Sequence, residues 1–361
     1  MHSKLRYPIL FSVLILFFGI FSAQAQESTI ELSPAETLGI PPAIRLPNLT
    51  MQHQDLNRCS AAALTIQLSY FNTGDYQEII HLLNPYGGDV SVRVEEMIRV
   101  AEYYGLKALV RRGGTIDLLR QVVAAGFPVL LENAYQDGED AYRDWMSHNR
   151  VLMGYDDRLQ QFYFFDPLLG AGDDGRGRAM SYVDVDMLWR QFNRDYVIVY
   201  REFDEGRLLD ILGEQYQPDF NAQWSLVQAQ FDIYGDTPDA FAYLNRGWAQ
   251  VELGQYTEAV EAFDAALDIG IPARMLWYEF GLFEAYLAAG RYDDVLTQGR
   301  RVLLMTEGVE EIYYYMGRAH DAMGDTAQAI EFYESAILRN RYYTEAQEAL
   351  AALQPETGAN G

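Results

Sequence analysis

The residues best suited to chemistry surround Cys59, the only cysteine of the 361-residue chain. Cys59 precedes an apolar stretch that ends near Phe71 and has a helical pattern, so its thiol is expected at a helix N-terminus. The unpaired N–H groups there favour thiolate, and Arg58 adds a neighbouring positive charge. Gln54, five residues upstream, can donate a side-chain N–H to an oxyanion. A lone cysteine is more often a small buried apolar residue, but this setting favours a nucleophile for acyl transfer.

Such a nucleophile needs a base beside the sulfur and a group that orients the base. Of the five histidines, His148 is the best placed, because it opens a predicted strand at 150–155 and can project from the edge of a sheet. Asp166 ends the next predicted strand, and antiparallel pairing of the two strands would bring it to His148. The sequence therefore predicts a Cys59, His148 and Asp166 triad, with Gln54 as the oxyanion donor.

The part of the chain that must position these residues mixes helical and strand patterns. Helices are predicted at 59–71, 76–83, 92–104 and 117–125, and strands at 128–132, 150–155, 161–165 and 196–200. Helices followed by a sheet indicate an α+β fold. The glycine- and aspartate-rich stretch 170–178 lacks the ligand spacing of a calcium loop and is interpreted as an ordinary loop. No cofactor or metal is expected.

From residue 223 onward the strand pattern gives way to an internal repeat. Small and aromatic residues recur at matched intervals, as Gly247, Gly254, Tyr256, Ala259, Phe263 and Ala266 and again as Gly317, Gly324, Thr326, Ala329, Tyr333 and Ala336. A looser copy lies between them, and equivalent positions are 36 and then 34 residues apart. This unit resembles the tetratricopeptide repeat. Three repeats, with flanking helices at 224–234 and 344–353, predict an all-α solenoid.

The first half also resembles a known family. The candidate residues occur in the order Gln54, Cys59, His148, Asp166. This order is similar to that of the bacteriocin-processing cysteine peptidases, family 39 of that class. The segment 151–156 matches the strand that follows the family's histidine, and Asp166-Pro167 matches its Asp-Pro segment. The resemblance covers 46–203. It implies a papain-like fold and hydrolysis of peptide bonds by the Cys-His-Asp triad.

Three positions depart from the family pattern and leave alternatives open. Ser60 and Ala61 stand where glycine and proline are usual, and Ser147 replaces a common glycine. The residue after the nucleophile lies against the substrate path, so a serine there can narrow it. One alternative is a catalytically inactive peptidase-like protein that binds peptides or proteins. A further alternative is a transferase or amidase that uses the same triad.

The first 25 residues have the pattern of a secretory signal peptide. Lys4 and Arg6 precede an apolar run at 9–21, and Ala23-Gln24-Ala25 has the small residues of a cleavage site. An exported protein, extracellular or extracytoplasmic, is predicted, with no integral membrane segment after signal cleavage. A single cysteine cannot form an internal disulfide, so folding must depend on hydrophobic cores.

The charge balance limits the partners. A net charge of −25 at pH 7 repels nucleic acid. The expected partners are a peptide or protein substrate and a protein bound by the repeats. Trp277, Tyr278 and the tyrosines at 313–315 can line a peptide groove, although most aromatics at helical spacing form repeat core.

Four segments follow from these patterns: a signal peptide at 1–25, a papain-like domain at 46–203, a linker at 204–222 and a tetratricopeptide-repeat domain at 223–355. The linker is polar and contains glycine and proline. Proteolysis within it is expected to release two folded pieces.

Overall fold

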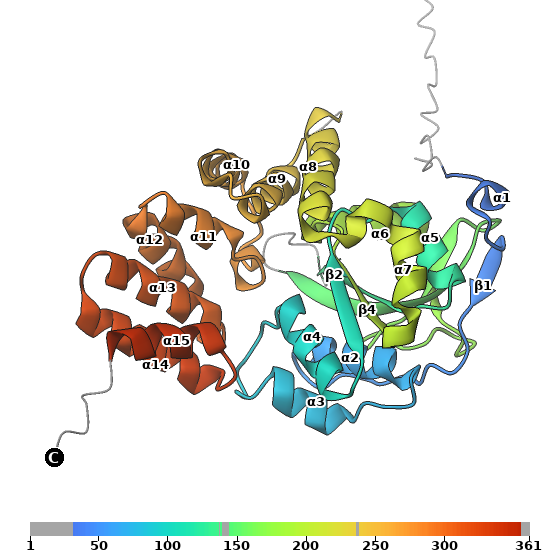
Figure 1. Ribbon diagram of the computed structural model, residues 1–361, viewed down its shortest axis with the longest axis horizontal. Helices are drawn as coiled ribbons and strands as arrows, with labels where there is room; N and C mark the ends of the chain where they lie inside the picture. Colours follow the sequence, from blue (N-terminus) through green and yellow to red (C-terminus); the bar gives the residue numbers. More distant parts are fainter. Residues whose placement is uncertain (1–31, 137, 139–143, 236–237, 355–361) are drawn as a thin grey trace, which may run out of the picture.

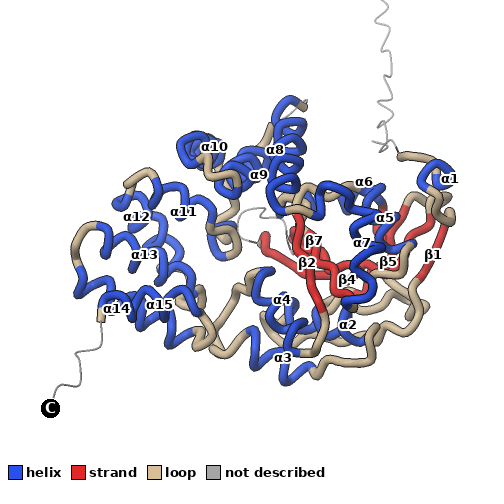
Figure 2. The backbone as a smooth tube through the Cα atoms, viewed as in Figure 1, coloured by secondary structure: helices blue, strands red, loops and turns tan. Residues whose placement is uncertain are grey.

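Figure 1 shows a computed structural model of the chain, in which residues 32–136, 138, 144–235 and 238–354 are described. An antiparallel sheet with its helices forms the first half, and helices form the second (Figure 2). The predicted signal peptide at 1–25 lies outside the described residues. The strands are β1 (Ala43–Arg45), β2 (Lys107–Arg111), β3 (Val129–Gln136), β4 (Trp145–Asp156), β5 (Gln161–Phe165), β6 (Arg178–Ser181) and β7 (Tyr196–Tyr200).

The sheet has the strand order β2-β7-β3-β4-β5-β6, and β1 pairs with the far end of β4. All these pairs are antiparallel. The apolar runs predicted as strands form β3, β4, β5 and β7, and every residue of β7 is buried. The strands that the sequence did not predict are β1, β2 and β6. They are short and partly exposed, so they carry no strong apolar pattern.

Strand β4 is longer than predicted, and this corrects the expected position of His148. The strand begins at Trp145, so His148 lies within it, pairs with Asn133 of β3 and is 3% exposed. It neither opens the strand nor projects from the sheet edge. The first part of β4 was not predicted because residues 147–150 are polar and lack the apolar pattern of a buried strand. They are nevertheless buried, and they form hydrogen bonds with neighbouring side chains.

Helices pack on both faces of the sheet. They are α1 (Ala35–Leu38), α2 (Cys59–Ser69), α3 (Tyr76–Leu83), α4 (Val94–Tyr103), α5 (Ile116–Ala124), α6 (Tyr182–Trp189) and α7 (Glu205–Leu212). The apolar cores on the two faces are separate: α2, α3 and α4 contribute to one, and α5, α6 and α7 to the other. The predicted helices α2 to α5 have ends within two residues of those observed, whereas α6 and α7 were not predicted.

The second half consists of three helix pairs between two flanking helices. They are α8 (Pro218–Tyr234), α9 (Ala240–Glu252), α10 (Tyr256–Ile269), α11 (Gly281–Ala288), α12 (Tyr292–Leu303), α13 (Glu310–Ala322), α14 (Thr326–Arg339) and α15 (Thr344–Leu353). Close helix packing explains why glycine recurs at equivalent positions of the repeats. A Cβ at Gly247 would lie 2.7 Å from the Phe263 ring, and one at Gly317 would lie 2.7 Å from the Tyr333 ring. Glycine therefore lets the paired helices approach closely.

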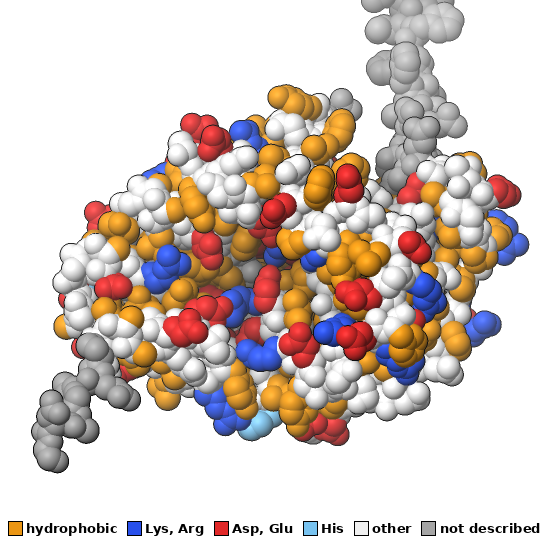
Figure 3. Space-filling model, viewed as in Figure 1, with side chains coloured by type: hydrophobic (Ala, Val, Ile, Leu, Met, Phe, Trp, Pro, Cys, Tyr) orange, Lys and Arg blue, Asp and Glu red, His pale blue; other side chains and the backbone are white. Residues whose placement is uncertain are grey.

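The repeats curve around one side of the sheet half, and both ends of the array touch it (Figure 1). Near the first repeat, Asn245 donates to the carbonyl oxygen of Arg190, at 2.7 Å. After the last pair, Asn340 donates to Glu96 of α4, at 2.9 Å. In Figure 3, acidic and basic side chains gather over this junction, at the centre of the view.

The segment 204–222, predicted to be a linker, is folded into the sheet half. It contains α7 and the start of α8, and Leu208 and Leu212 are buried in the core shared with α5. Gly206 and Gly213, which suggested a linker, are exposed, whereas the polar residues Asp204 and Asn221 are buried. Among the described residues, no helix has the length and apolar character needed to cross a bilayer.

Candidate active site

Helix α2 places Cys59 at its first position, as the sequence predicts. Small residues let this helix lie directly against the sheet, since Ala61, Ala62 and Ala63 are all fully buried. Further along, the amide of Gln67 donates to the carbonyl oxygens of Pro128 and Val197, at 2.9 and 2.8 Å. These buried hydrogen bonds fix α2 across the sheet, and with it the position of the thiol.

His148 and Asp166 meet in the structure as the triad hypothesis requires. Nε2 of His148 lies 2.8 Å from Oδ1 of Asp166. The other ring nitrogen, Nδ1, is therefore the one left for Cys59, whose pKa is lowered by His148. The contact arises because β4 and β5 are adjacent and antiparallel, so the residue just beyond β5 lies beside the middle of β4.

Asp166 is fully buried and is held from several sides. Its Oδ2 accepts from Nε of Arg150, at 2.8 Å, and its Oδ1 accepts from the backbone N–H groups of Leu168 and Leu169, each at 2.9 Å. Burial alone would raise the pKa of Asp166. The hydrogen bond to His148 and the charges of His148 and Arg150 outweigh burial and lower the pKa below its usual range. The carboxylate is thus a permanent anion that orients His148.

The thiol of Cys59 is shifted toward its ionised form. Burial raises its pKa, but hydrogen bonds and charge from His148, together with hydrogen bonds from Asn149, lower it to about 7. For His148, burial lowers the pKa, and the bonds to Asp166 and Cys59 raise it above its ordinary value. A thiolate–imidazolium pair is therefore favoured near neutral pH.

Arg58 has a smaller part than the sequence indicated. Its side chain is buried and points a guanidinium nitrogen toward the carbonyl oxygen of Tyr86, at 3.5 Å. The main influences that lower the pKa of Cys59 come instead from His148 and Asn149.

Gln54 lies in the same cavity wall as Cys59 and His148. Its backbone N–H donates to the carbonyl oxygen of Pro167, at 3.1 Å, which ties the segment before α2 to the turn after Asp166. Its buried Oε1 has no hydrogen-bond partner, and its Nε2 has no acceptor among the described residues. The amide is therefore free to bind a group in the cavity.

The two unusual serines are both held by neighbouring polar groups. Ser60 is buried, and its Oγ accepts from Nδ2 of Asn149, at 3.0 Å. Ser147 donates to the carboxyl group of Glu132 on β3. Burial raises the pKa of Glu132 to about 8, and the nearby charges of Asp195 and Cys59 add to this shift. Both serines therefore brace the walls of the site.

The cavity that contains Cys59 is built from both halves of the chain. It has a volume of about 440 Å³. One wall comes from the sheet half and includes Gln54, Cys59 and His148. The other comes from the loops between repeats: Arg274, Trp277, Tyr278, Met305 and Thr306.

Tyr278 brings this repeat-derived wall close to the sulfur. Its ring centroid lies 6.2 Å from those of both Trp145 on β4 and Phe192. Burial raises the pKa of its hydroxyl, and the negative charge on Cys59 raises it further. Of the aromatic residues considered for a peptide groove, Trp277 and Tyr278 line this cavity. By contrast, Tyr313 and Tyr315 are buried in the repeat core.

A separate cluster of carboxylates lies where α4 meets α13. Oxygen atoms of Glu96, Glu310 and Glu311 lie within 4.8 Å of one another, and all three residues are buried. Asn340 donates to Glu96 and Glu310, and the guanidinium of Arg93 lies 3.4 Å from Glu311. These contacts account for the cluster as part of the junction between the two halves.

The sequence missed three residues that shape the site: Asn149, Arg150 and Glu132. Asn149 and Arg150 directly follow His148 in β4. The alternation of side chains along a strand was the only sequence signal that could have indicated their place near the site. Glu132 is the last residue of the predicted strand at 128–132, whose other residues are apolar. An acidic residue in such a run indicates a buried polar contact.

Each half of the chain matches known family models. Residues 44–197 match the model of the Peptidase_C39 like family. Residues 240–270 and 310–343 each match a tetratricopeptide repeat model. The chain therefore carries a Peptidase_C39-like domain and, after it, tetratricopeptide repeats.

Parts of the chain also resemble solved structures, at low sequence identity and low TM-score. The peptidase domain of Streptococcus ComA, a bi-functional ABC transporter, has 14% identity and a TM-score of 0.33, covering 43% of this chain and 99% of its own. Xylellain, a cysteine protease from Xylella fastidiosa, has 12% identity and a TM-score of 0.32, covering 47% and 90%. MamA from Desulfovibrio magneticus has 18% identity and a TM-score of 0.35, covering 42% and 84%. None of the curated proteins matches this sequence.

Proposed function

We propose that the protein is an exported cysteine peptidase whose nucleophile is Cys59. One observation carries the proposal. Cys59 begins α2 and lines one cavity with His148, which lowers the pKa of the thiol and is itself held at Nε2 by Asp166. This arrangement has the nucleophile, the base and the orienting group that acyl transfer requires.

In the first step the thiolate of Cys59 attacks a peptide carbonyl carbon, and the carbonyl oxygen becomes an oxyanion. The amide of Gln54 and the backbone N–H of Cys59 are the donors for this oxyanion, because N–H groups of the first helical turn lack partners within the helix. The C–N bond then breaks, and the imidazolium of His148 gives its proton to the leaving amine.

A thioester between Cys59 and the acyl half of the peptide remains. His148, now neutral, takes a proton from water, and the resulting hydroxide attacks the thioester carbonyl. The C–S bond breaks, which releases a carboxylic acid and restores the thiolate. Asp166 keeps Nδ1 of His148 directed at the sulfur throughout, because it holds Nε2.

Export is the second part of the proposal and depends on the sequence of residues 1–25. A cleavable signal peptide would separate the mature chain from residues 1–25. Expression of the full chain in bacteria, followed by fractionation and N-terminal sequencing, tests this. A mature N-terminus close to Gln26 supports export, whereas a chain that retains Met1 in the cytoplasm contradicts it.

The peptidase assignment is tested by thiol reactivity and by hydrolysis. We expect iodoacetamide to label Cys59 with a midpoint near pH 7, as the lowered pKa requires. Hydrolysis of a quenched fluorescent peptide pool should disappear in Cys59→Ala. Turnover should fall about 10²–10³-fold in Gln54→Ala, the usual loss for one oxyanion donor.

Two results would refute the assignment. The first is a labelling midpoint at the ordinary value for a free thiol. The second is retained hydrolysis in Cys59→Ala. Slow labelling of Cys59 together with unchanged peptide binding by Cys59→Ala would instead support the inactive binding module.

A further inference from the structure

The loops between repeats add two features to the cavity that the catalytic steps do not use. One is a charged side chain, Arg274, which precedes the short helix η4 (Met275–Trp277). The other is Met305, which follows α12 and also lines a second, apolar pocket. Both lie opposite the wall that contains Cys59.

Arg274 is a half-buried cation without an acidic partner. Among the described residues it forms no ion pair and no side-chain hydrogen bond, and its guanidinium lies 5.3 Å from the Trp277 ring centroid. Other arginines at the junction are paired, such as Arg93 with Glu311 and Arg112 with Asp195. Among the described residues, Arg274 therefore brings an unpaired positive charge to the wall of this cavity.

The remaining charged groups of the cavity do not neutralise Arg274. Glu132 has a pKa raised to about 8, so it is largely protonated at neutral pH. His148 is paired with Asp166 and with the thiolate. The free charge that this cavity offers a ligand is thus positive, and a guanidinium binds carboxylates with good geometry.

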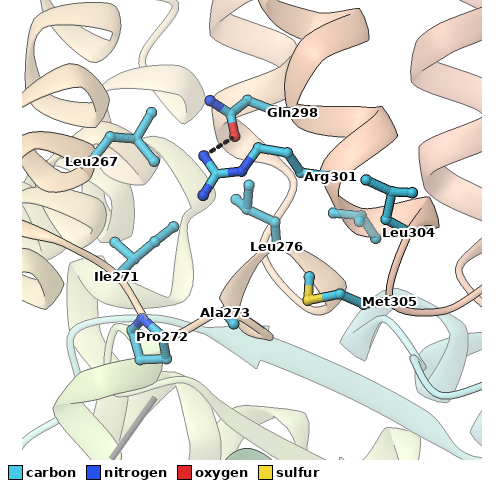
Figure 4. A pocket seen from close by; sticks show the side chains of 10 residues that line it. Leu267, Ile271, Pro272, Ala273, Leu276, Gln298, Arg301, Leu304 and Met305 are labelled. Carbon is cyan, nitrogen blue, oxygen red and sulfur yellow. Dashed lines mark hydrogen bonds between the residues drawn. The ribbon is translucent and has the colours of Figure 1, made fainter. Parts of the chain in front are cut away.

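The second pocket continues the same surface. It has a volume of about 300 Å³ and is lined mainly by apolar side chains from the end of α10, the loop after it, η4 and the end of α12 (Figure 4). Two polar residues of α12, Gln298 and Arg301, also line it. Leu304 at its rim is 87% exposed. Met305 lines both cavities, so the apolar pocket lies next to the cavity that contains Cys59.

We propose that these repeat loops select the substrate: Arg274 binds a carboxylate of a peptide near the scissile bond, and the apolar pocket receives an apolar side chain of the same peptide. The proposal rests on the peptidase function proposed above. It identifies the substrate class as peptides in which an acidic group and an apolar residue lie on one side of the cleaved bond. The acidic group is either an Asp or Glu side chain or a C-terminal carboxylate.

Two small alkylating reagents test the charge without any peptide. Iodoacetate and iodoacetamide both alkylate Cys59 with loss of iodide, but only iodoacetate carries a carboxylate. We expect the rate constant for iodoacetate, divided by that for iodoacetamide, to fall roughly three- to tenfold in Arg274→Gln, the effect of one charge in the same partly solvated cavity. Arg274→Lys should keep the ratio. Arg300→Gln, which removes an exposed charge from α12, is the matched control.

Peptides then distinguish the two sources of the carboxylate. Quenched fluorescent peptides are compared in pairs that differ in Glu against Gln at one position, or in a free against an amidated C-terminus. We expect one pair type to show a several-fold lower KM for the acidic member, with this difference lost in Arg274→Gln. Leu304→Ser should raise KM for peptides with an apolar residue and leave the alkylation ratio unchanged.

The failures are separable. An alkylation ratio that is the same in Arg274→Gln and in the wild type overturns the role of Arg274, whatever the peptides do. Hydrolysis with no preference in either pair type overturns the substrate class while the peptidase function stands. A third outcome is that no peptide is hydrolysed, while the rate ratio of iodoacetate to iodoacetamide still falls in Arg274→Gln. This outcome refutes the peptidase function and shows that the cavity binds anions.

Discussion

The sheet half and the repeat half differ in the kinds of residue that they bury. In the sheet half, ionisable side chains lie deep in the fold, and each is held by partners, as Asp166 is by His148 and Arg150. In the repeats, glycine faces an aromatic ring, as Gly247 faces Phe263. Substitutions in the first kind of core should change ionisation and chemistry, whereas substitutions in the second should change packing and stability.

The junction between the halves combines both means. Trp145 of β4 stacks on Phe192, at 5.3 Å between ring centroids, and lies in one apolar cluster with repeat residues such as Phe280. Next to α4, the buried carboxylates of Glu96, Glu310 and Glu311 meet Arg93. The two halves are therefore joined by a core of their own, which the expectation of two separable pieces did not include.

The largest expected effect is that of His148→Ala in the sheet half. Hydrolysis should fall by about 10³-fold or more, because the base and the ion-pair partner of Cys59 are removed together. The labelling midpoint of Cys59 should rise from about 7 toward or above 9.0, because burial then outweighs the remaining hydrogen bonds. Labelling with iodoacetamide against pH measures this. A folded variant with full activity and an unchanged midpoint would contradict the assigned role.

Trp145→Ala tests whether the halves share one core. Loss of this buried ring should cost about 3–5 kcal/mol of unfolding free energy. This loss of stability should appear as one unfolding transition, in which the sheet and helix signals of the circular dichroism spectrum change together. If the halves share one core, cleavage within 204–222 should leave neither half folded, so the protease should degrade both. Two separate transitions, with only the sheet half destabilised, would restore the picture of independent pieces.

The acidic cluster predicts that the junction weakens as pH rises. Burial, and then the charge of Glu96, raise the pKa of Glu310 from 4.5 to about 7. The folded state therefore binds more protons than the unfolded state between these values, so the unfolding free energy falls as pH increases through this window. The loss from one such group is on the order of 3 kcal/mol.

Glu310→Gln removes this titration and should flatten the slope between pH 5 and pH 7 in urea unfolding curves. The matched control is Glu258→Gln, an exposed position on α10. An unchanged slope in Glu310→Gln would show that this carboxyl group is ionised in the folded protein.

The smallest effect is expected for a methyl group added within a repeat. Gly247→Ala places a Cβ 2.7 Å from the Phe263 ring, and the overpacking should cost about 1–3 kcal/mol, despite the better helix propensity of alanine. Gly206→Ala in α7 is the control, because nothing lies within 4 Å of its added Cβ. That change should be neutral or stabilising. Equal melting temperatures for the two variants would mean that Phe263 moves freely.

The sequence alone determined the local elements and the repeat. The helix beginning at Cys59 and the repeated glycine-to-aromatic spacing follow from periodicity, which depends only on residues near one another in the chain. The partnership of His148 with Asp166 was also predicted, because two adjacent antiparallel strands suffice to bring them together.

The tertiary structure alone decided what surrounds the catalytic groups. Asn149, Arg150 and Glu132 act through partners 15 to 90 residues away, and no local pattern identifies those partners. The wall containing Arg274 and Tyr278 is more than 200 residues from Cys59 in sequence. It reaches the cavity only because the array of repeats curves back onto the sheet. Contacts between such distant segments depend on how well their whole surfaces fit together. The local spacing of residues in the sequence does not predict these contacts.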